Sequence, residues 1–338
     1  MKQAWVIRHG GPEVLAIREA PDPAVESGAV RIRVEAAGVN FADVLARIGL
    51  YPDAPPPPCV LGYEVAGVVD AVGPEVAGLR AGDRVLAITR FGGYSSVVVV
   101  PTAQAVPLPA SLTAAKAAAI PVNYMTAWLM LIRCGNLQPG EQVLVHAAAG
   151  GVGQAAVQIS RWRGATVIGT ASAAKHERLR ESGVAHCIDY HRQDVLTEVR
   201  RLTGGRGVDI VLDAVGGRSF GDSYRCLAPL GRLMVFGMSS FATGKKRRLL
   251  AVVRGLLATP RFHPLSLINK NRGVFGLNIG HLWSESALLR GMLDEIVGLA
   301  AAGTFDPVVD RAFPLAEVAG AHAYLQEHRN FGKVVLVP

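Results

Sequence analysis

The stretch His146–Gly153, HAAAGGVG, decides the fold of this chain. It follows a short apolar run, residues 142–147 (QVLVHA), that predicts a buried strand, and it opens a run at 153–162 (GQAAVQISRW) that predicts a helix. A glycine-rich turn between a strand and a helix is the place where dinucleotide-binding folds hold a pyrophosphate. The turn therefore suggests a nucleotide site, although the same turn can also serve simple packing.

In the G-x-G-x-x-G register the three fingerprint positions are Ala148, Gly150 and Gly153. Alanine can serve at the first position if the turn keeps ordinary dihedrals there. Glycine remains at the second position, where backbone approaches the pyrophosphate, and at the third, where helix and strand pack closely. The helix that follows would present its N-terminal N–H groups and dipole to the diphosphate.

Outward from this loop, the sequence alternates between strands and helices. Strands are predicted at 142–147, 165–171, 187–190, 208–216 and 231–238, and helices between them at 153–162, 175–182, 194–203 and 223–230. This alternation indicates an α/β fold with a doubly wound, Rossmann-type parallel sheet. The first 120 residues are β-rich instead, and the tail is predicted to form a strand at 273–280, a long helix at 285–302, and a strand, a helix and a final strand at 307–338.

The strand after the loop favours NADPH over NADH. An NAD enzyme usually places an acidic residue about 20 residues beyond the fingerprint, where it binds the ribose 2′-OH. This chain has Ser172 and Lys175 in that region and no acid, and such donors suit a 2′-phosphate. Tyr190, after the third strand, is a further candidate for the same phosphate. Lys175 as a solvated helix residue and Tyr190 as a surface tyrosine remain open alternatives.

Composition indicates a soluble, cytoplasmic protein. The chain has 338 residues, half of them hydrophobic, and its N-terminus lacks the features of a signal peptide. Its four cysteines are widely spaced and form no C-x-x-C pair, so neither a disulfide framework nor a structural zinc is expected. It also has no G-x-S-x-G, H-E-x-x-H or P-loop motif, and a nucleotide fold without them is most plausibly used for hydride chemistry.

The net charge of +8 is local. Residues 223–284 contain ten Lys and Arg and no Asp or Glu, whereas the rest of the chain has 25 basic and 27 acidic residues. The densest cluster is Lys245, Lys246, Arg247 and Arg248, followed by an amphipathic run. Such a segment suits an anionic membrane surface, or it is a solvated loop leading into a helix that covers the substrate cleft or meets a second subunit. Nucleic acid is not expected, because interleaved aromatics and a recognised motif are missing.

Five motifs together resemble the medium-chain dehydrogenase/reductase superfamily. They are Gly38–Asp43 (GVNFAD), Gly62–Val69 (GYEVAGVV) followed by Gly73, Ala81–Val85 (AGDRV), AAAGGVG, and Gly332–Leu336 (GKVVL). The resemblance covers essentially the whole chain. Within the superfamily it is closest to the zinc-free quinone oxidoreductases, and stretches such as NFADVLARIGLYP and NFGKVVLVP are most similar to the vesicle amine transport protein homologues.

The resemblance implies a β-rich, GroES-like catalytic domain at 1–122 and 273–338, a Rossmann NADPH-binding domain at 123–272, and a homodimer. The zinc alcohol dehydrogenases of the superfamily have Cys and His ligands where this chain has Asn40 and Tyr63, and their third ligand position falls in the Val122–Asn123 region. No metal site is therefore expected. The implied activity is zinc-independent hydride transfer from NADPH to a quinone or an α,β-unsaturated carbonyl. The alternative is a nucleotide-binding, membrane-associated or adaptor protein with little turnover.

The resemblance also assigns site residues by position. Tyr51 and Asn40 are the catalytic candidates, Tyr51 as proton donor or substrate-orienting group. The cofactor-binding candidates are Asn40, Thr126, Ala149, Gly150, Gly151, Val152, Gly153, Ser172, Lys175, Tyr190, Phe236, Gly237, Met238, Leu277, Asn278 and Lys333. Simpler interpretations remain open for Asn40 as a turn residue, Tyr51 as a loop anchor and Phe236 as part of the core.

Overall fold

The computed structural model describes residues 1–242 and 249–338 and divides the chain into two compact units. The first comprises Met1–Met125 and Ile279–Pro338, and the second comprises residues 126–242 and 249–278. The sequence placed these boundaries at 122/123 and 272/273. The second one differs because strand β14 (Gly273–Gly276) pairs in parallel with β13 (Leu227–Val235) and so belongs to the second unit.

The second unit contains a six-stranded sheet in the order β11-β10-β9-β12-β13-β14, in which every pairing is parallel. Its remaining strands are β9 (Gln142–Val145), β10 (Thr166–Thr170), β11 (His186–Ile188) and β12 (Val208–Asp213). Its crossover helices are α4 (Gly151–Trp162), α5 (His176–Glu181), α6 (Val195–Leu202) and α7 (Ser219–Cys226). Strand order reverses at β9, which is the Rossmann topology predicted from the sequence.

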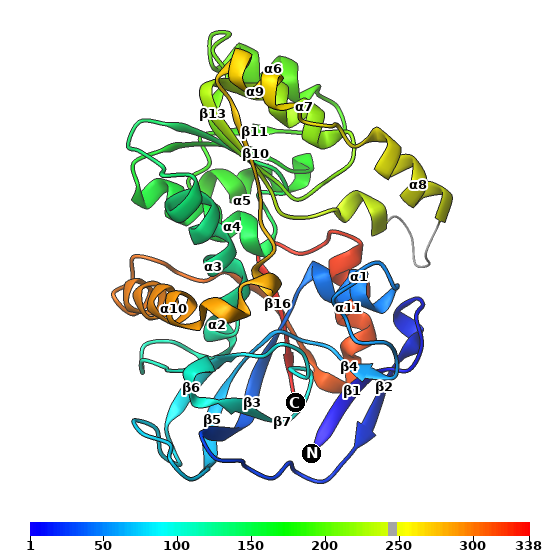
Figure 1. Ribbon diagram of the computed structural model, residues 1–338, viewed down its shortest axis with the longest axis vertical. Coiled ribbons are helices and arrows are strands. Elements are labelled where there is room, and N and C mark those ends of the chain that lie inside the picture. Colours follow the sequence, from blue (N-terminus) through cyan, green and yellow to red (C-terminus); the bar gives the residue numbers. More distant parts are fainter. Residues whose placement is uncertain (243–248) are drawn as a thin grey trace. The chain divides into compact units, whose positions relative to one another are not determined.

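Burial on both faces explains the apolar strands of this sheet. All six residues of β12 are buried, and three of the four in β9 are. In Figure 1, α4 and α5 cover one face of the sheet, and α6 and α7 cover the other. Parallel strands covered on both faces have nearly continuous hydrophobic sequences, as the strands in this half of the chain do.

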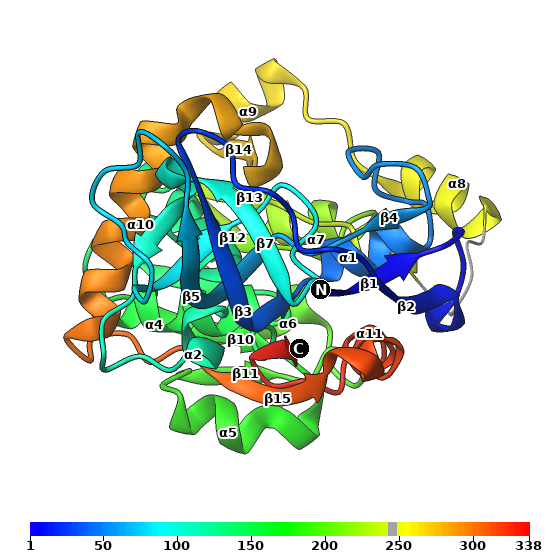
Figure 2. The same cartoon turned by 90° about the horizontal axis from the view of Figure 1, so that it is seen from below.

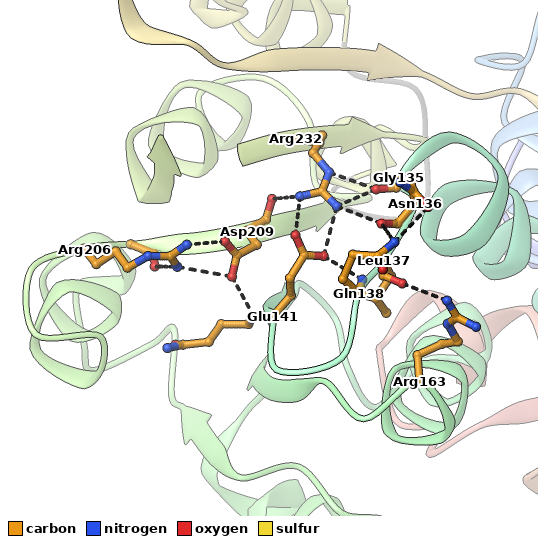
Figure 3. Close-up of polar contacts among 11 residues, drawn as sticks. Gly135, Asn136, Leu137, Gln138, Glu141, Arg163, Arg206, Asp209 and Arg232 are labelled. Carbon is orange, nitrogen blue, oxygen red and sulfur yellow. Dashed lines mark hydrogen bonds and ion pairs between the residues drawn. The ribbon is translucent and has the colours of Figure 1, made fainter. Parts of the chain in front are cut away.

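The amino edge of this sheet is closed by a cluster of charged residues, drawn in Figure 3. Arg232 of β13 makes a two-pronged ion pair with Glu141, with nitrogen–oxygen distances of 2.8 and 3.0 Å, and its Nε donates to the carbonyl of Gly135 at 2.9 Å. Asp209 of β12 accepts from the backbone N–H of Gln142 at 2.8 Å and from Arg206 at 2.6 Å. Such paired bonds satisfy both partners. We therefore assign this edge of the sheet a role in the stability of the fold.

Helix α7 differs from its prediction. The sequence suggested a helix over 223–230, but α7 ends at Cys226 and β13 begins at Leu227. Pro229 disfavours helical backbone at the preceding residue, so the chain becomes extended there. Leu227 then pairs with Val208 of β12, which extends the sheet by the residues predicted to be helical.

The first unit is a β-rich domain. Its larger sheet has the order β15-β16-β3-β5-β6-β8, with β7 also paired to β3, and a smaller sheet has the order β2-β1-β4. Figure 2 shows β3, β5 and β7 side by side. The larger sheet consists of β3 (Ala29–Val39), β5 (Glu64–Val72), β6 (Arg84–Ile88), β7 (Val97–Pro101), β8 (Ala105–Pro107), β15 (Val309–Pro314) and β16 (Lys333–Val337). The smaller sheet consists of β1 (Lys2–Val6), β2 (Leu15–Glu19) and β4 (Cys59–Val60).

The helices of the first unit close its core. They include α1 (Phe41–Arg47), α2 (Ala114–Ala117), α10 (Ser286–Ala301) and α11 (Val318–Gln326). Apolar residues of β3, β5 and β16 are buried with Val318, Ala321 and Leu325 of α11. The chain's return after residue 279 is thus required to complete this core, which makes the domain discontinuous in sequence.

Among residues 1–242 and 249–338, one segment has the length and composition of a membrane span. Residues 114–134 have a mean hydropathy of 1.2 over an 18-residue window, but 78% of that window is buried inside the protein. The segment includes α2, α3 (Pro121–Trp128) and a π-helical turn (Leu129–Cys134). Its apolar character is therefore explained by the protein core. The four cysteines are unpaired, as the sequence predicted.

Candidate functional site

The glycine loop between β9 and α4 has the close packing that its sequence predicts. Ala147 has a left-handed backbone, with φ of 52°, whereas Ala148 is not among the residues with positive φ. An alanine is therefore tolerated at the first fingerprint position. A Cβ on Gly153 would lie 2.4 Å from the carbonyl oxygen of Ala147 and 2.6 Å from that of Ala148. Only glycine lets α4 begin this close to the loop.

The amino end of α4 faces the carboxyl edge of the sheet. The helix has 12 residues, Gly150 is its N-cap, and its first turn has no acidic residue. The first N–H groups of an α-helix have no acceptor within the helix. The N–H groups of Gly151, Val152 and Gly153 can therefore hold an anion such as a diphosphate, whereas that of Gly150 donates to the Ala147 carbonyl at 2.8 Å.

The ends of β10 and β11 bring the three predicted 2′-phosphate residues to one edge. Thr170 pairs with Ile188, and Ser172 and Tyr190 each lie two residues beyond that pair. Lys175 follows in a 3₁₀ turn, with its N–H donating to the carbonyl of Ser172 at 3.0 Å. Burial, followed by the charge of Asp189, raises the pKa of Tyr190, so this side chain stays a hydroxyl donor at neutral pH.

The predicted nicotinamide-side residues lie at the ends of the next strands. Phe236, Gly237 and Met238 follow β13 directly, and Leu277 and Asn278 follow β14. The N–H of Phe236 donates to the carbonyl of Asp213 at 3.1 Å, and that of Leu277 donates to Val235 at 2.9 Å. Because all strands are parallel, these ends share the edge that holds the glycine loop.

A buried chain of polar side chains crosses the same edge, and the sequence analysis did not identify it. His146 bonds through Nε2 to the Ser223 hydroxyl at 2.9 Å and through Nδ1 to the Thr170 hydroxyl at 3.3 Å. Ser223 donates to Asp213 at 2.6 Å. We call these four residues the His146 relay. Burial lowers the pKa of His146, so the ring is neutral. In the sequence, three members of the relay could have been noticed because a histidine, a threonine and an aspartate stand at the ends of three predicted strands. The fourth member, Ser223 of α7, belongs to no recognisable motif.

In the first unit, a buried charge cluster holds Asn40. Its Nδ2 donates to Glu64 at 2.9 Å, and its Oδ1 accepts from the ammonium of Lys333 at 2.6 Å. Lys333 also forms an ion pair with Glu64, and these two side chains are 2% and 0% exposed. Glu64 further accepts the N–H of Val122, at the start of α3, at 2.7 Å. Asn40 and Lys333 are thus brought together, with Glu64 as the member that the sequence analysis missed.

A second buried acid lies beside this cluster. Asp43 accepts from the N–H of Asn40 at 2.8 Å, from the hydroxyl of Tyr94 at 2.9 Å and from the N–H of Gly62 at 3.2 Å. Burial raises its pKa to about 6, against these hydrogen bonds and the charge of Lys333. The acid anchors α1 to the G-Y-E motif that begins at Gly62.

Tyr51 borders a cavity in the first unit. Its ring meets the ring of Tyr63 edge-on, with 6.4 Å between centroids. The cavity has a volume of about 420 Å³ and is lined by His9, Gly49, Leu50, Tyr51, Pro52, Ala54 and Pro56. Tyr63 is 9% exposed, and burial, followed by the charge of Asp43, raises its pKa far above the usual value. The cavity is open to solvent, and its lining is more apolar than polar.

Comparison with known proteins identifies the family to which the chain belongs. Residues 26–110 match the family described as alcohol dehydrogenase GroES-like domain, and residues 182–336 match the one described as zinc-binding dehydrogenase. The human synaptic vesicle membrane protein VAT-1 homolog is 44% identical over 325 residues, which cover 96% of this chain and 82% of that protein. The chain belongs to the medium-chain dehydrogenase/reductase superfamily.

Quinone oxidoreductases of this superfamily are also similar. One from Pseudomonas aeruginosa is 37% identical over 340 residues, covering all of this chain and 99% of that protein. The crystal structure of Escherichia coli quinone oxidoreductase complexed with NADPH has a TM-score of 0.89 and 31% identity, with complete coverage of both chains. The predicted superfamily and its two-domain α/β architecture are thus confirmed.

The superfamily's catalytic zinc does not fit the residues at its ligand positions. Both amide atoms of Asn40 are already bonded, the nitrogen to Glu64 and the oxygen to the Lys333 ammonium at 2.6 Å, so the amide has the wrong partners for a metal ligand. Tyr63 offers a buried hydroxyl whose raised pKa opposes the anionic form. Over residues 1–242 and 249–338, no group of three or more His, Cys, Asp or Glu side chains could hold a metal ion.

Two further predictions concern Thr126 and the basic cluster. Thr126 is 6% exposed and lies in α3, at the first residue of the second unit. The basic cluster Lys245–Arg248 lies outside the residues that the structure describes. Its role in this superfamily member stays a prediction.

Proposed function

We propose that this protein is a zinc-independent, NADPH-dependent reductase of quinones or α,β-unsaturated carbonyls. The observation that carries the proposal is the state of Asn40, whose amide is fixed by Glu64 and Lys333 at a position where zinc-dependent relatives have a metal ligand. An acceptor for this site must be electrophilic without a metal ion, and quinones and conjugated carbonyls meet that condition.

NADPH, when bound, supplies the hydride. The residues that would hold it are the backbone around α4 for the diphosphate, Ser172, Lys175 and Tyr190 for the 2′-phosphate, and the ends of β13 and β14 for the nicotinamide side. The absence of an acid between β10 and Lys175 supports NADPH, because a carboxylate there would repel the phosphate.

For the acceptor, Tyr51 is the orienting residue that we propose. It borders a cavity lined mainly by apolar groups, and its hydroxyl can donate a hydrogen bond to a carbonyl oxygen. Transfer of a hydride to a quinone gives the hydroquinone anion, and one proton then gives the hydroquinone. Water can supply that proton directly, or Tyr51 can supply it and be reprotonated by water.

The test follows NADPH oxidation at 340 nm with a panel of quinones and enones, with and without a zinc chelator. Turnover that the chelator leaves unchanged supports the proposal. NADPH binding without reduction of any acceptor would contradict it, and so would activity that the chelator abolishes. A Tyr51→Phe variant should raise KM for the acceptor more than KM for NADPH, whereas Tyr324→Phe, outside the cavity, should change neither.

Exposed apolar residues on α8 (Leu249–Ala258) and α9 (Pro264–Lys270) favour a second function, attachment to an anionic membrane surface with little turnover. They are Val253, Leu256, Leu257, Leu265 and Ile268, with exposed fractions from 50% to 82%. They lie within the acid-free, basic part of the chain. Flotation with vesicles containing phosphatidylserine, compared with phosphatidylcholine alone, tests this function. Vesicle binding that Leu256→Ser with Leu257→Ser abolishes would support it, and no binding to either vesicle would remove it.

A homodimer is proposed from the superfamily alone. Sedimentation equilibrium should give twice the chain mass of 35.7 kDa, and a monomeric mass would contradict the proposal.

A further inference from the structure

We infer that the His146 relay positions the phosphate-binding loop, and that Thr170 is its contact with the loop. The relay consists of Asp213, Ser223, His146 and Thr170. It ends at the N–H of Ala147, which donates to the Thr170 hydroxyl at 3.3 Å. The inference rests on the proposed function, because it assumes that the loop holds the diphosphate of NADPH.

The direction of every hydrogen bond in the relay follows from its fixed end. Asp213 is fully buried, and its carboxylate only accepts hydrogen bonds. Its Oδ1 accepts from the N–H groups of Val215 and Gly216, at 2.7 and 3.3 Å. Its Oδ2 accepts from the hydroxyls of Ser219 and Ser223, at 2.7 and 2.6 Å.

The Ser223 hydroxyl has one proton, and Asp213 takes it. Ser223 must therefore accept from His146, which places the imidazole proton on Nε2. Nδ1 is then an acceptor, and it receives the hydroxyl proton of Thr170. The Thr170 oxygen in turn accepts the N–H of Ala147. Each member of the relay thus fixes the orientation of the next.

The loop needs this support because its first residue is strained. Ala147 adopts φ of 52°, which is costly for a residue with a Cβ. Gly150 donates to the Ala147 carbonyl at 2.8 Å, and Ala148 donates to the Thr170 carbonyl at 3.1 Å. Thr170 therefore bonds two consecutive loop N–H groups, one through its side chain and one through its backbone. Loss of the hydroxyl removes the bond to the strained residue and the bond to His146 Nδ1, and it leaves the backbone bond to Ala148 in place.

Thr170→Val tests the relay, since valine keeps the shape of threonine and removes the hydroxyl. Thr170→Ser restores the hydroxyl. Ser219→Ala is the matched control, because it removes a hydroxyl bond to the same Asp213 oxygen without breaking the path to the loop. Two probes separate loop positioning from general damage: NADP⁺ contains the diphosphate, and adenosine 2′-monophosphate does not.

We expect Thr170→Val to weaken NADP⁺ binding about tenfold, which corresponds to one hydrogen bond of about 1.4 kcal/mol. Affinity for adenosine 2′-monophosphate should change by less than about twofold, the change that a hydrogen bond remote from this ligand allows. Thr170→Ser and Ser219→Ala should bind NADP⁺ nearly as the unaltered protein does. The KM for NADPH should rise in Thr170→Val, with kcat at saturating NADPH unchanged.

Four results would overturn the inference. Equal weakening of both probes would indicate a general structural effect. Equal effects of Thr170→Val and Ser219→Ala would show that the path to the loop is irrelevant. If the unaltered protein binds no NADP⁺, the proposed function and this inference fail together, whereas normal NADP⁺ binding by Thr170→Val refutes the inference alone.

Discussion

Two glycines of the phosphate loop should respond differently to alanine, because Gly153 is limited by packing and Gly150 by the approach of the diphosphate. At Gly153 a Cβ would lie 2.4 Å from a carbonyl oxygen of the loop, and Cβ contacts below 3.0 Å essentially never occur. The backbone would have to move by about 0.6 Å to relieve this contact. At Gly150 the nearest atom, the Ala147 carbonyl oxygen, would be 3.2 Å away, and φ is an ordinary −78°. Packing therefore excludes a side chain at Gly153 but not at Gly150.

The magnitudes follow from opposing terms. Overpacking of this kind costs about 3 kcal/mol, and alanine inside a helix recovers about 1 kcal/mol relative to glycine. Gly153→Ala should therefore lower the free energy of unfolding by about 2 kcal/mol. Gly150→Ala should cost less than about 1 kcal/mol, since alanine is only a poorer N-cap. It should nevertheless weaken NADP⁺ binding at least about tenfold, because its Cβ would occupy the space that the diphosphate approaches.

Guanidinium chloride unfolding of the ligand-free proteins measures the free energy of unfolding. The stacked Trp128–Trp162 pair in the second unit supplies a fluorescence signal there. Titration with NADP⁺ measures the affinity of each variant for the cofactor. The reasoning is refuted if Gly150→Ala is the more destabilised variant, or if it binds NADP⁺ as tightly as the unaltered protein does.

Three further predictions concern charges. Lys175→Ala should weaken NADPH about tenfold or more and leave NADH almost unchanged, since only NADPH has the 2′-phosphate; equal losses in binding assays would contradict the assignment. Lys333→Met should lower the free energy of unfolding by about 3–5 kcal/mol because it leaves Glu64 unpaired, and adding Glu64→Gln should recover part of that loss in denaturant titrations. No recovery would show that the pair is not the cause. For Asp43, the folded-state pKa of about 6 exceeds the usual 3.8, so its stabilising contribution is complete below pH 4 and is lost as pH rises through 6. Asp43→Asn should remove about 3 kcal/mol of this pH dependence. If the unfolding midpoints of both proteins fall equally as the pH rises through 6, this prediction is wrong.

The second unit was the more predictable part of the fold. Its strands and helices follow from apolar runs broken by glycine and polar residues, because a parallel sheet covered on both faces requires that pattern. The error at α7 arose where Pro229 and pairing with β12 outweighed a helical pattern. In the first unit, the sequence shows strands but not their order. Pairing of β3 with β16, about 300 residues later, depends on packing that no local pattern contains.

The candidate site also contains residues that could be predicted from the sequence and residues that could not. Residues that we propose to contact a ligand through loop position or charge, such as Gly150 and Lys175, could be named from spacing alone. Residues that act through another side chain could not. Glu64 and Ser223 became visible only when the fold brought them to Asn40 and His146. Both are fully or almost fully buried polar groups, and the energetic need to satisfy such groups is what builds these clusters.

The buried cluster around Asn40 also bears on the choice of acceptor. Lys333 and Glu64 neutralise each other, so Asn40 lies beside a pair without net charge. Such a pair provides little stabilisation for the localised negative charge of an alkoxide. Negative charge that a quinone or enone gains on accepting a hydride is spread over its conjugated system and needs less compensation from the protein. The electrostatics of the first unit therefore favour the same class of acceptor as the misfit of zinc at Asn40 and Tyr63.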